Sequence, residues 1–258
     1  MGVMGLFRLD GKVALVTGGS RGLGLQLAAG LGEAGCRLAI AARKADELAA
    51  AEALLRARGI EAAGFVCDLR RPAGIPALVE SVVQRMGPID VLVNNAGTIW
   101  SAPAEDHPDE GWHKVMQLNV DAPFFLSREV ARRCMIPRGQ GKIVNIGSVA
   151  GLKGTQAGVH TVAYNTSKAA LLNLTRTLAC EWGPYGIHVN ALCPGLFPTQ
   201  EEGRSVLGHV REPVRARTPL QRLGGEEDLK GSIVFLASEA SSHITGQVLV
   251  VDGGESVR

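Results

Sequence analysis

Short apolar runs alternate with longer helical patterns along this chain of 258 residues. The runs are almost continuously aliphatic or β-branched, which is typical of strands buried on both faces. Strand–helix alternation of this kind predicts a doubly wound α/β fold, with seven mostly parallel strands, right-handed crossovers and helices on both faces of the sheet. The predicted strands cover 12–17, 37–42, 61–67, 89–94, 142–147, 187–192 and 247–251.

The chain is long enough, and at 46% hydrophobic residues apolar enough, to fill one large core. We therefore predict a single domain over 1–258. One stretch, 196–225, interrupts the strand–helix rhythm, because it is rich in Gly, Pro and Arg and holds no clear strand. We predict a surface excursion there, with a short helix, that forms a candidate substrate lid. The predicted helices cover 22–34, 44–58, 72–86, 108–136, 161–183 and 226–238.

Charge and cysteine usage exclude several classes of protein. There are 27 basic and 25 acidic residues and no basic tract, so no nucleic-acid partner is expected. The five cysteines are scattered and form no C-x-x-C pair, which argues against a disulfide framework or a metal site and fits a reducing, cytoplasmic location. No apolar run reaches membrane-spanning length, so no membrane partner is expected.

A glycine-rich turn follows the first predicted strand, with Gly18, Gly22 and Gly24 ahead of a helical pattern. Glycines let the backbone approach a pyrophosphate closely, and the helix N-terminus offers unpaired N–H groups. The spacing G-x-x-x-G-x-G differs from the common G-x-G-x-x-G fingerprint. The pattern favours a Rossmann-like dinucleotide site over an ordinary strand-to-helix turn.

The end of the second strand indicates which dinucleotide is bound. An acid at this place would bind the ribose hydroxyls of NAD, but the sequence has Ala42, followed by Arg43 and Lys44. A guanidinium suits a 2′-phosphate, and Arg21 in the glycine turn adds a second one. We predict that NADP(H) is preferred over NAD(H). The alternative is that Arg43 and Lys44 only face solvent.

Tyr164 and Lys168 are four residues apart in a predicted helix and therefore share a face. A nearby ammonium stabilises a phenolate and lowers the pKa of a tyrosine, which is otherwise near ~10. Ser148 follows the strand 142–147, at the strand end where open α/β sheets bind ligands. These three residues predict proton transfer to or from a substrate oxygen.

Ordered motifs along nearly the whole chain make it resemble the classical short-chain dehydrogenase/reductase family. The resemblance implies an oxidoreductase that transfers a hydride between NADP(H) and a carbonyl or secondary alcohol, working as a homo-oligomer, a tetramer or dimer. The motifs are T17-G-G-S-R-G-L-G24, D68-L69, N94-N-A-G97, L118-N119-V120, G147-S148, Y164-N-T-S-K168, P194-G195 with Thr199, and T245-G-Q-V-L-V-V-D-G-G254.

The resemblance also implies a role for each matching residue. Tyr164 would be the acid or base, Lys168 would hold the nicotinamide ribose and lower the tyrosine pKa, Ser148 would position the substrate oxygen, and Asn119 would anchor a water. Asp68 would contact the adenine, with the Leu69 backbone beside it. The implied cofactor residues are Gly18, Ser20, Arg21, Gly22, Leu23, Gly24, Arg43, Lys44, Asp68, Leu69, Asn95, Ala96, Gly97, Tyr164, Lys168, Pro194, Gly195, Phe197 and Thr199.

The segment between Ser148 and Tyr164 is longer than the family pattern, and we expect its extra residues to border the substrate pocket. His160 lies in this segment and Trp100 closely follows N94-N-A-G97, so both are candidate substrate contacts beside Ser148 and Tyr164. The chain looks most like the gluconate 5-dehydrogenase-like branch, which implies a sugar acid. A 3-oxoacyl-carrier-protein-reductase-like activity stays open, as does a catalytically silent NADP-binding sensor or scaffold.

Overall fold

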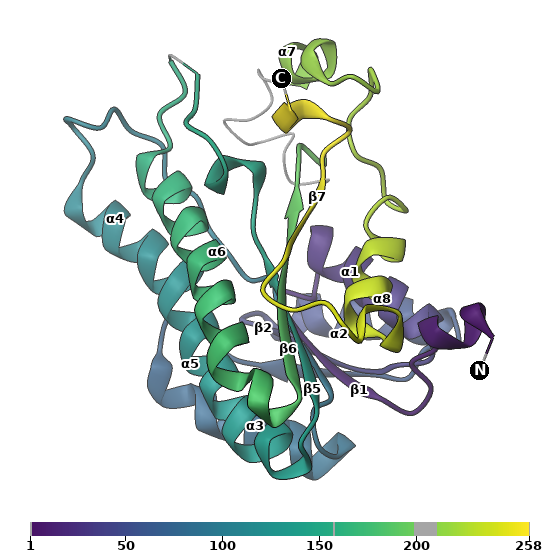
Figure 1. Cartoon of the computed structure of the whole chain (residues 1–258). Coiled ribbons are helices and arrows are strands. Elements are labelled where there is room, and N and C mark those ends of the chain that lie inside the picture. Colours follow the sequence, from purple (N-terminus) through teal and green to yellow (C-terminus); the bar gives the residue numbers. More distant parts are fainter. Residues whose placement is uncertain (1, 157, 199–210, 258) are drawn as a thin grey trace.

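The computed structural model describes residues 2–156, 158–198 and 211–257. Seven parallel strands form one sheet in the order β3-β2-β1-β4-β5-β6-β7. The sheet lies between helices (Figure 1). The predicted fold class is therefore confirmed. The strands are β1 Val13–Thr17, β2 Arg37–Ala42, β3 Ala62–Val66, β4 Val91–Asn94, β5 Gly141–Ile146, β6 Ile187–Pro194 and β7 Val248–Val251.

The strand order reverses beside β1, which pairs with β2 on one side and with β4 on the other. The chain first builds the sheet outward to β3 and then crosses over to build the half from β4 to β7. Loops on the two sides of such a reversal diverge and leave a crevice at the carboxyl ends of the strands. A ligand site is therefore expected between the loops after β1 and β4.

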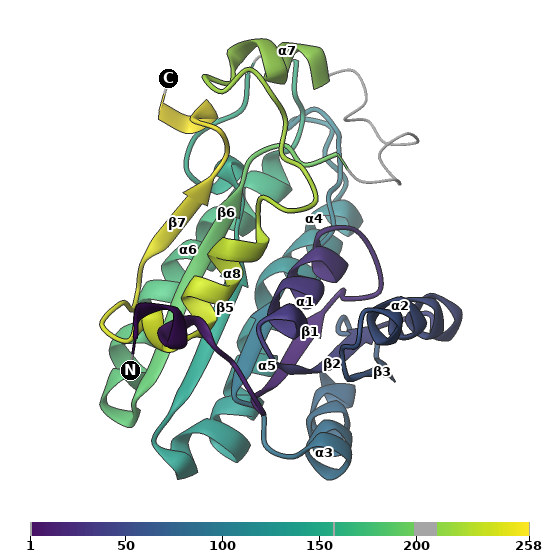
Figure 2. The same cartoon turned by 90° about the vertical axis from the view of Figure 1, so that its right-hand side faces the viewer.

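Helices cover both faces of the sheet, because each presents one apolar stripe to the buried strands (Figure 2). One core contains residues of α1, α2 and α8, and the other contains residues of α3, α5 and α6. The two cores enclose the strands on both sides, which explains their continuous apolar runs. The helices are α1 Gly22–Glu33, α2 Ala45–Ala57, α3 Ile75–Met86, α4 Asp109–Met116, α5 Ala122–Val130, α6 Val162–Trp182, α7 Arg211–Arg217 and α8 Lys230–Ala237.

The predicted helix over 108–136 is divided in the structure. A π-helical turn, Gln117–Asp121, joins α4 to α5, and a second one, Ala131–Met135, follows α5. Such turns widen the helix by one residue without ending it, so the apolar pattern in the sequence does not reveal them. The first π turn contains Asn119 and therefore matters for the site below.

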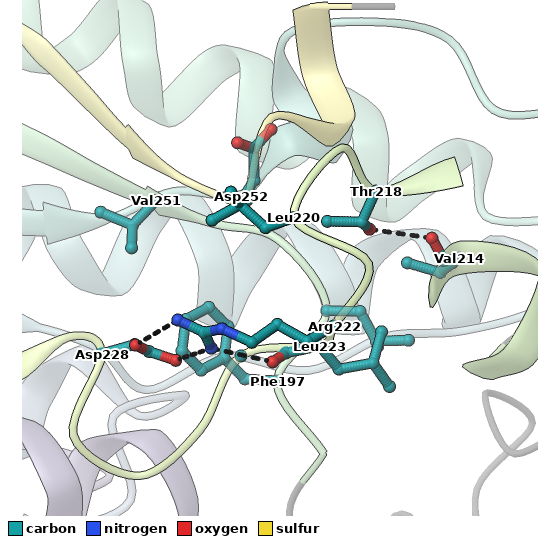
Figure 3. Close-up of a pocket in the computed structure, with 12 residues that line it drawn as sticks. Phe197, Val214, Thr218, Leu220, Arg222, Leu223, Asp228, Val251 and Asp252 are labelled. Carbon is teal, nitrogen blue, oxygen red and sulfur yellow. Dashed lines mark hydrogen bonds and ion pairs between the residues drawn. The ribbon is translucent and has the colours of Figure 1, made fainter. Parts of the chain in front are cut away.

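The described part of the candidate lid contains α7, which is the short helix expected there. The backbone after α7 is tied down by hydrogen bonds from Thr218 Oγ1 to the Val214 carbonyl, at 2.8 Å, and from Arg222 to both carboxylate oxygens of Asp228, at 2.5 and 2.9 Å (Figure 3). Thr199 lies outside the described residues. None of the helices within the described ranges has the length and apolar character that a membrane crossing needs.

Candidate active site

Several of the predicted site residues lie at the carboxyl ends of four neighbouring strands. The glycine turn follows β1, Asn95–Gly97 follow β4, Ser148 follows β5, and Pro194 ends β6. Because β1, β4, β5 and β6 are adjacent in the sheet, these loops meet at one edge, across the point where the strand order reverses.

The glycine turn has a backbone that other residues cannot easily adopt. Gly18 and Gly22 have positive φ angles of 63° and 52°. A Cβ atom on Gly24 would lie 2.1 Å from the Gly18 carbonyl oxygen, so a side chain there would clash. The turn leads directly into α1. The first N–H groups of this helix and its positive dipole end suit an anion such as a pyrophosphate.

A set of hydrogen bonds fixes the glycine turn against the end of β4. The hydroxyl oxygen of Thr17 accepts hydrogen bonds from the N–H groups of Asn95, at 2.9 Å, and Ala96, at 3.0 Å. The side-chain amide of Asn95 donates back to the Thr17 carbonyl at 2.8 Å. Asn95 therefore holds two loops in place, in addition to lining the crevice beside them.

A cavity of about 280 Å³ lies beside this turn. Its lining suits the adenosine end of a dinucleotide, because it combines backbone N–H groups, a glycine-lined approach and three cationic side chains. The chemistry of these residues therefore fits the predicted cofactor. The lining includes Gly18, Ser20, Arg21, Gly22, Leu23, Gly24, Arg43, Lys44, Asp68, Leu69, Asn95, Ala96 and Gly97, all of which were predicted to bind it.

Asp68 is paired within the protein. Its carboxylate accepts hydrogen bonds from the guanidinium of Arg70 at 2.9 and 2.6 Å, and this pairing, aided by the charge of Arg43, lowers the pKa of Asp68. An adenine amino group could therefore reach this carboxylate only by sharing it with Arg70 or displacing it. The predicted adenine contact stays a prediction.

Lys168 is the most deeply buried charged group of the catalytic set, at 5% exposure. Its ammonium donates a hydrogen bond to the Ile146 carbonyl at 2.7 Å, and its Nζ lies 5.7 Å from the centroid of the Tyr164 ring. Burial lowers its pKa from 10.5 to about 8, because desolvation disfavours the charged amine. The ammonium is thus close to the phenol and easily deprotonated for a lysine.

Asn119 is a buried residue of the first π turn, and its side chain makes hydrogen bonds to two neighbouring segments. Its side-chain oxygen accepts from the Thr98 N–H at 2.8 Å, and its amide nitrogen donates to the Thr98 carbonyl at 2.9 Å and to the Ser167 hydroxyl at 3.0 Å. The amide therefore connects the loop after β4 to α6, which carries Tyr164 and Lys168. Its predicted role in holding a water stays a prediction.

Ser148 is positioned by the turn that follows it. Its hydroxyl oxygen accepts from the Ala150 N–H at 3.1 Å, and Asn165 donates to the Ala150 carbonyl at 2.8 Å. A Cβ atom on Gly151 would lie 2.7 Å from the Lys168 carbonyl carbon, so this turn packs closely against α6. Ser148 is therefore held at a fixed distance from the helix that carries Tyr164.

A cavity of about 580 Å³ brings Ser148, Tyr164 and Lys168 together. Its lining includes three predicted cofactor residues, Pro194, Gly195 and Phe197, and several residues of the long segment before α6. That segment therefore borders the pocket, as expected. Two cations that the sequence analysis did not select as site residues also line the cavity, Lys153 and Arg217.

Trp100 and His160, the two further candidate substrate contacts, do not line this cavity. The Trp100 ring packs against α4, where the Lys114 ammonium lies 5.0 Å from it, and His160 is exposed. Gly111 in α4 leaves room for the indole of Trp100, because a Cβ atom at this position would lie only 2.8 Å from the ring. Their predicted contact with substrate finds no support in this geometry.

Glu47 was not predicted as a site residue, but it lines the cavity beside the glycine turn, which is the candidate cofactor cavity. Its position three residues after Lys44 was the available signal, since such pairs meet on a helix face. Arg217 belongs to a set of lid arginines that could attract an anionic substrate or only face solvent, and it is one that lines the cavity. Lys153 had a weaker signal, because only the folded chain shows which surface cations reach a given cavity. Within the described residues, no group of three or more His, Cys, Asp or Glu side chains could hold a metal ion.

Comparison with known proteins agrees with this geometry. The family model described as Enoyl-(Acyl carrier protein) reductase matches residues 18–256. The chain is 43% identical to gluconate 5-dehydrogenase of Gluconobacter oxydans (strain 621H) over 253 residues, which cover 98% of this chain and 97% of the relative. It is 40% identical to the rhamnolipids biosynthesis 3-oxoacyl-[acyl-carrier-protein] reductase of Pseudomonas aeruginosa, covering 96% and 97%.

A solved structure is similarly close. The crystal structure of a gluconate 5-dehydrogenase from Burkholderia cenocepacia J2315, in complex with NADP and tartrate, matches with a TM-score of 0.92 and 38% identity, covering 100% of both chains. Both the fold and the sequence are therefore shared over the full length. The chain belongs to the short-chain dehydrogenase/reductase family, whose members are oxidoreductases acting on CH–OH groups.

Proposed function

We propose that this protein is an NADP(H)-dependent oxidoreductase that interconverts a keto sugar acid and its hydroxy acid. The observation that carries the proposal is the 580 Å³ cavity, which Ser148, Tyr164 and Lys168 share with Lys153 and Arg217. NADP(H) supplies or accepts the hydride. The relative from Gluconobacter oxydans and the NADP complex from Burkholderia cenocepacia support this choice of substrate and cofactor.

In the reducing direction, Tyr164 gives its phenolic proton to the substrate oxygen as the carbonyl carbon receives the hydride, which yields an alcohol. In the oxidising direction, the phenolate removes that proton. Ser148 donates a hydrogen bond to the same oxygen and orients it. The proton balance closes through solvent, from which the phenolate regains its proton after each reduction.

Lys168 supports this exchange by charge. Its Nζ lies 5.7 Å from the Tyr164 ring centroid, so its ammonium favours the phenolate over the phenol. Asn119 keeps α6 against the loop after β4 through its bonds to Ser167 and Thr98, which preserves the distance between Tyr164 and the cofactor crevice. The residues that line the smaller cavity, beside the glycine turn, would bind the adenosine end of the cofactor.

The substrate carboxylate would be held at the far side of the cavity by Lys153 and Arg217. The guanidinium of Arg217 donates to the Gln156 side chain at 2.6 Å, and the Lys153 ammonium donates to the Glu255 carbonyl at 3.1 Å. These contacts keep both cations at the cavity wall, beside Glu255. A carboxylate is the group that such a pair recognises most strongly.

The test compares wild type with Arg217→Met, with NADPH and a 5-keto sugar acid as substrates. We expect the KM for the sugar acid to rise about tenfold, with little change in kcat, because one charged hydrogen bond is lost. Arg215→Met is the matched control, since Arg215 is on the same helix, pairs with Glu212 and does not line the cavity. Equal KM values in wild type and Arg217→Met would reject the carboxylate site.

A second candidate substrate is a 3-oxoacyl thioester, favoured by the similarity to the reductase of Pseudomonas aeruginosa. A higher kcat/KM for short 3-oxoacyl thioesters than for keto sugar acids would support it and reject the sugar acid. A catalytically silent NADP-binding sensor would bind NADPH and reduce neither substrate. Preference for NADP(H) over NAD(H), homo-oligomeric assembly and a cytoplasmic location remain part of the proposal.

A further inference from the structure

A carboxylate lies in the cationic corner of the cofactor cavity. Glu47, in the first turn of α2, is 2.6 Å from the Lys44 ammonium and 3.6 Å from Nε of Arg21, and it accepts a hydrogen bond from the Ser20 hydroxyl at 3.4 Å. Lys44 and then Arg21 hold the pKa of Glu47 below its usual range, so the group is ionised at neutral pH. Glu47 therefore contacts three of the residues predicted to bind the cofactor.

This placement opposes a 2′-phosphate and favours a ribose with two hydroxyl groups. A phosphate entering the corner meets a carboxylate that repels it and already occupies Lys44 and Arg21. A ribose hydroxyl, in contrast, is a donor that a carboxylate accepts. The position at the end of β2 where an acid would serve NAD is taken by Ala42, and Glu47 brings an acid into the same cavity from the next helix.

The cavity lining holds few charged groups, so the charge of Glu47 strongly affects the binding of a 2′-phosphate. Among the described residues, three cations line it, Arg21, Arg43 and Lys44, and two carboxylates, Glu47 and Asp68. Asp68 forms its ion pair with Arg70, which does not line the cavity, and interacts with Arg43 by charge only. Glu47 is the carboxylate that contacts two of them.

We propose that Glu47 is a specificity-determining residue that limits the preference for NADP(H) and lets the site accept NAD(H). The inference rests on the proposed cofactor function of this cavity. It assigns Glu47 opposite effects on the two cofactors, which a merely structural role in the first turn of α2 would not produce. Glu47 thereby balances the cations that make the corner suitable for a 2′-phosphate.

The test is binding of NADPH and NADH to wild type, Glu47→Gln and Asp46→Asn by calorimetry. Gln keeps the size of the side chain and removes its charge. We expect the ratio of the Kd for NADH to the Kd for NADPH to rise about fivefold in Glu47→Gln, and the rise to shrink at high salt. Asp46→Asn is the matched control, because Asp46 is in the same turn, is exposed and does not line the cavity.

An unchanged or lower ratio in Glu47→Gln would overturn the inference, as would an equal rise in Asp46→Asn, which would indicate a long-range field rather than this carboxylate. Damage to the fold would weaken both cofactors by the same factor and lower Tm, so Tm is measured as well, and an unchanged ratio at the Tm of wild type is the result that counts against the inference. Tighter binding of NADH than NADPH by wild type would reject the proposed preference for NADP(H). The preference for NADP(H) is measured in wild type alone, whereas the role of Glu47 is measured by comparing the variant with wild type. Failure of one proposal can therefore be distinguished from failure of the other.

Discussion

At the scale of single residues, the catalytic arrangement costs stability. Lys168 is 5% exposed and has one hydrogen bond to the Ile146 carbonyl, so its ammonium loses most of its hydration in the folded chain. Burial lowers its pKa from 10.5 to about 8. The cost is fully present below pH 8 and is relieved as the pH rises towards 10.5, because the unfolded chain then binds a proton that the folded chain lacks.

We therefore predict that Lys168→Met stabilises the protein while it removes activity. The free energy of unfolding should increase by about 1–2 kcal/mol near neutral pH, since the gain from desolvation exceeds the loss of one hydrogen bond. Denaturant unfolding measured across the alkaline range should show this gain disappearing as the pH approaches 10.5. A variant less stable than wild type at neutral pH would contradict the burial cost assigned to Lys168.

The sequence predicted that Ser148, Tyr164 and Lys168 act together, and the three side chains line one cavity in the structure. Tyr164 and Lys168 share a helix face, and Ser148 follows a strand end, so local rules place them. Arg217 was one of several lid arginines that the sequence left open between a solvated face and attraction of an anionic substrate. Glu47 and Lys153 were not predicted, because their importance depends on where loops and helix ends meet in space. An exposed charged residue has no sequence pattern that separates a cavity wall from a solvated face.

At the scale of elements, the strands and most helices follow from apolar periodicity. β2 spans Arg37–Ala42 as predicted, and α6 spans Val162–Trp182 against a prediction of 161–183. The π turns were not predicted, because one additional residue in a helix leaves the apolar pattern nearly intact. The first π turn contains Asn119, whose side chain joins the loop after β4 to α6 through hydrogen bonds to Thr98 and Ser167.

The glycine turn supplies the prediction at this scale. Gly24→Ala should weaken NADPH binding more than about tenfold and lower Tm, because its Cβ would lie 2.1 Å from the Gly18 carbonyl oxygen and displace the turn. Gly231→Ala is the control: it adds the same methyl group to α8, where nothing lies within 4 Å, and should raise Tm slightly. Calorimetry and thermal unfolding measure both effects. Unimpaired NADPH binding by Gly24→Ala would show that the turn does not approach the cofactor closely.

At the scale of the whole molecule, the sheet order brings together groups that are distant in sequence. The adjacent ends of β1, β4, β5 and β6 carry the glycine turn, Asn95, Ser148 and Pro194. Alternating strands and helices predict this architecture, since right-handed crossovers and buried parallel strands leave few other arrangements. The substrate cavity was not predictable in the same way, because α7 and the segment before α6 complete it from loops without a repeating pattern.

The most direct test of the proposed chemistry is the rate of a single turnover in Tyr164→Phe, with a 5-keto sugar acid and NADPH. The substitution removes the phenolic hydroxyl and keeps the ring that lies beside Lys168. The proposed proton transfer predicts that reduction slows by about 10²–10⁴-fold while the Kd for NADPH stays within about twofold of wild type. Reduction at the wild-type rate by Tyr164→Phe would contradict it.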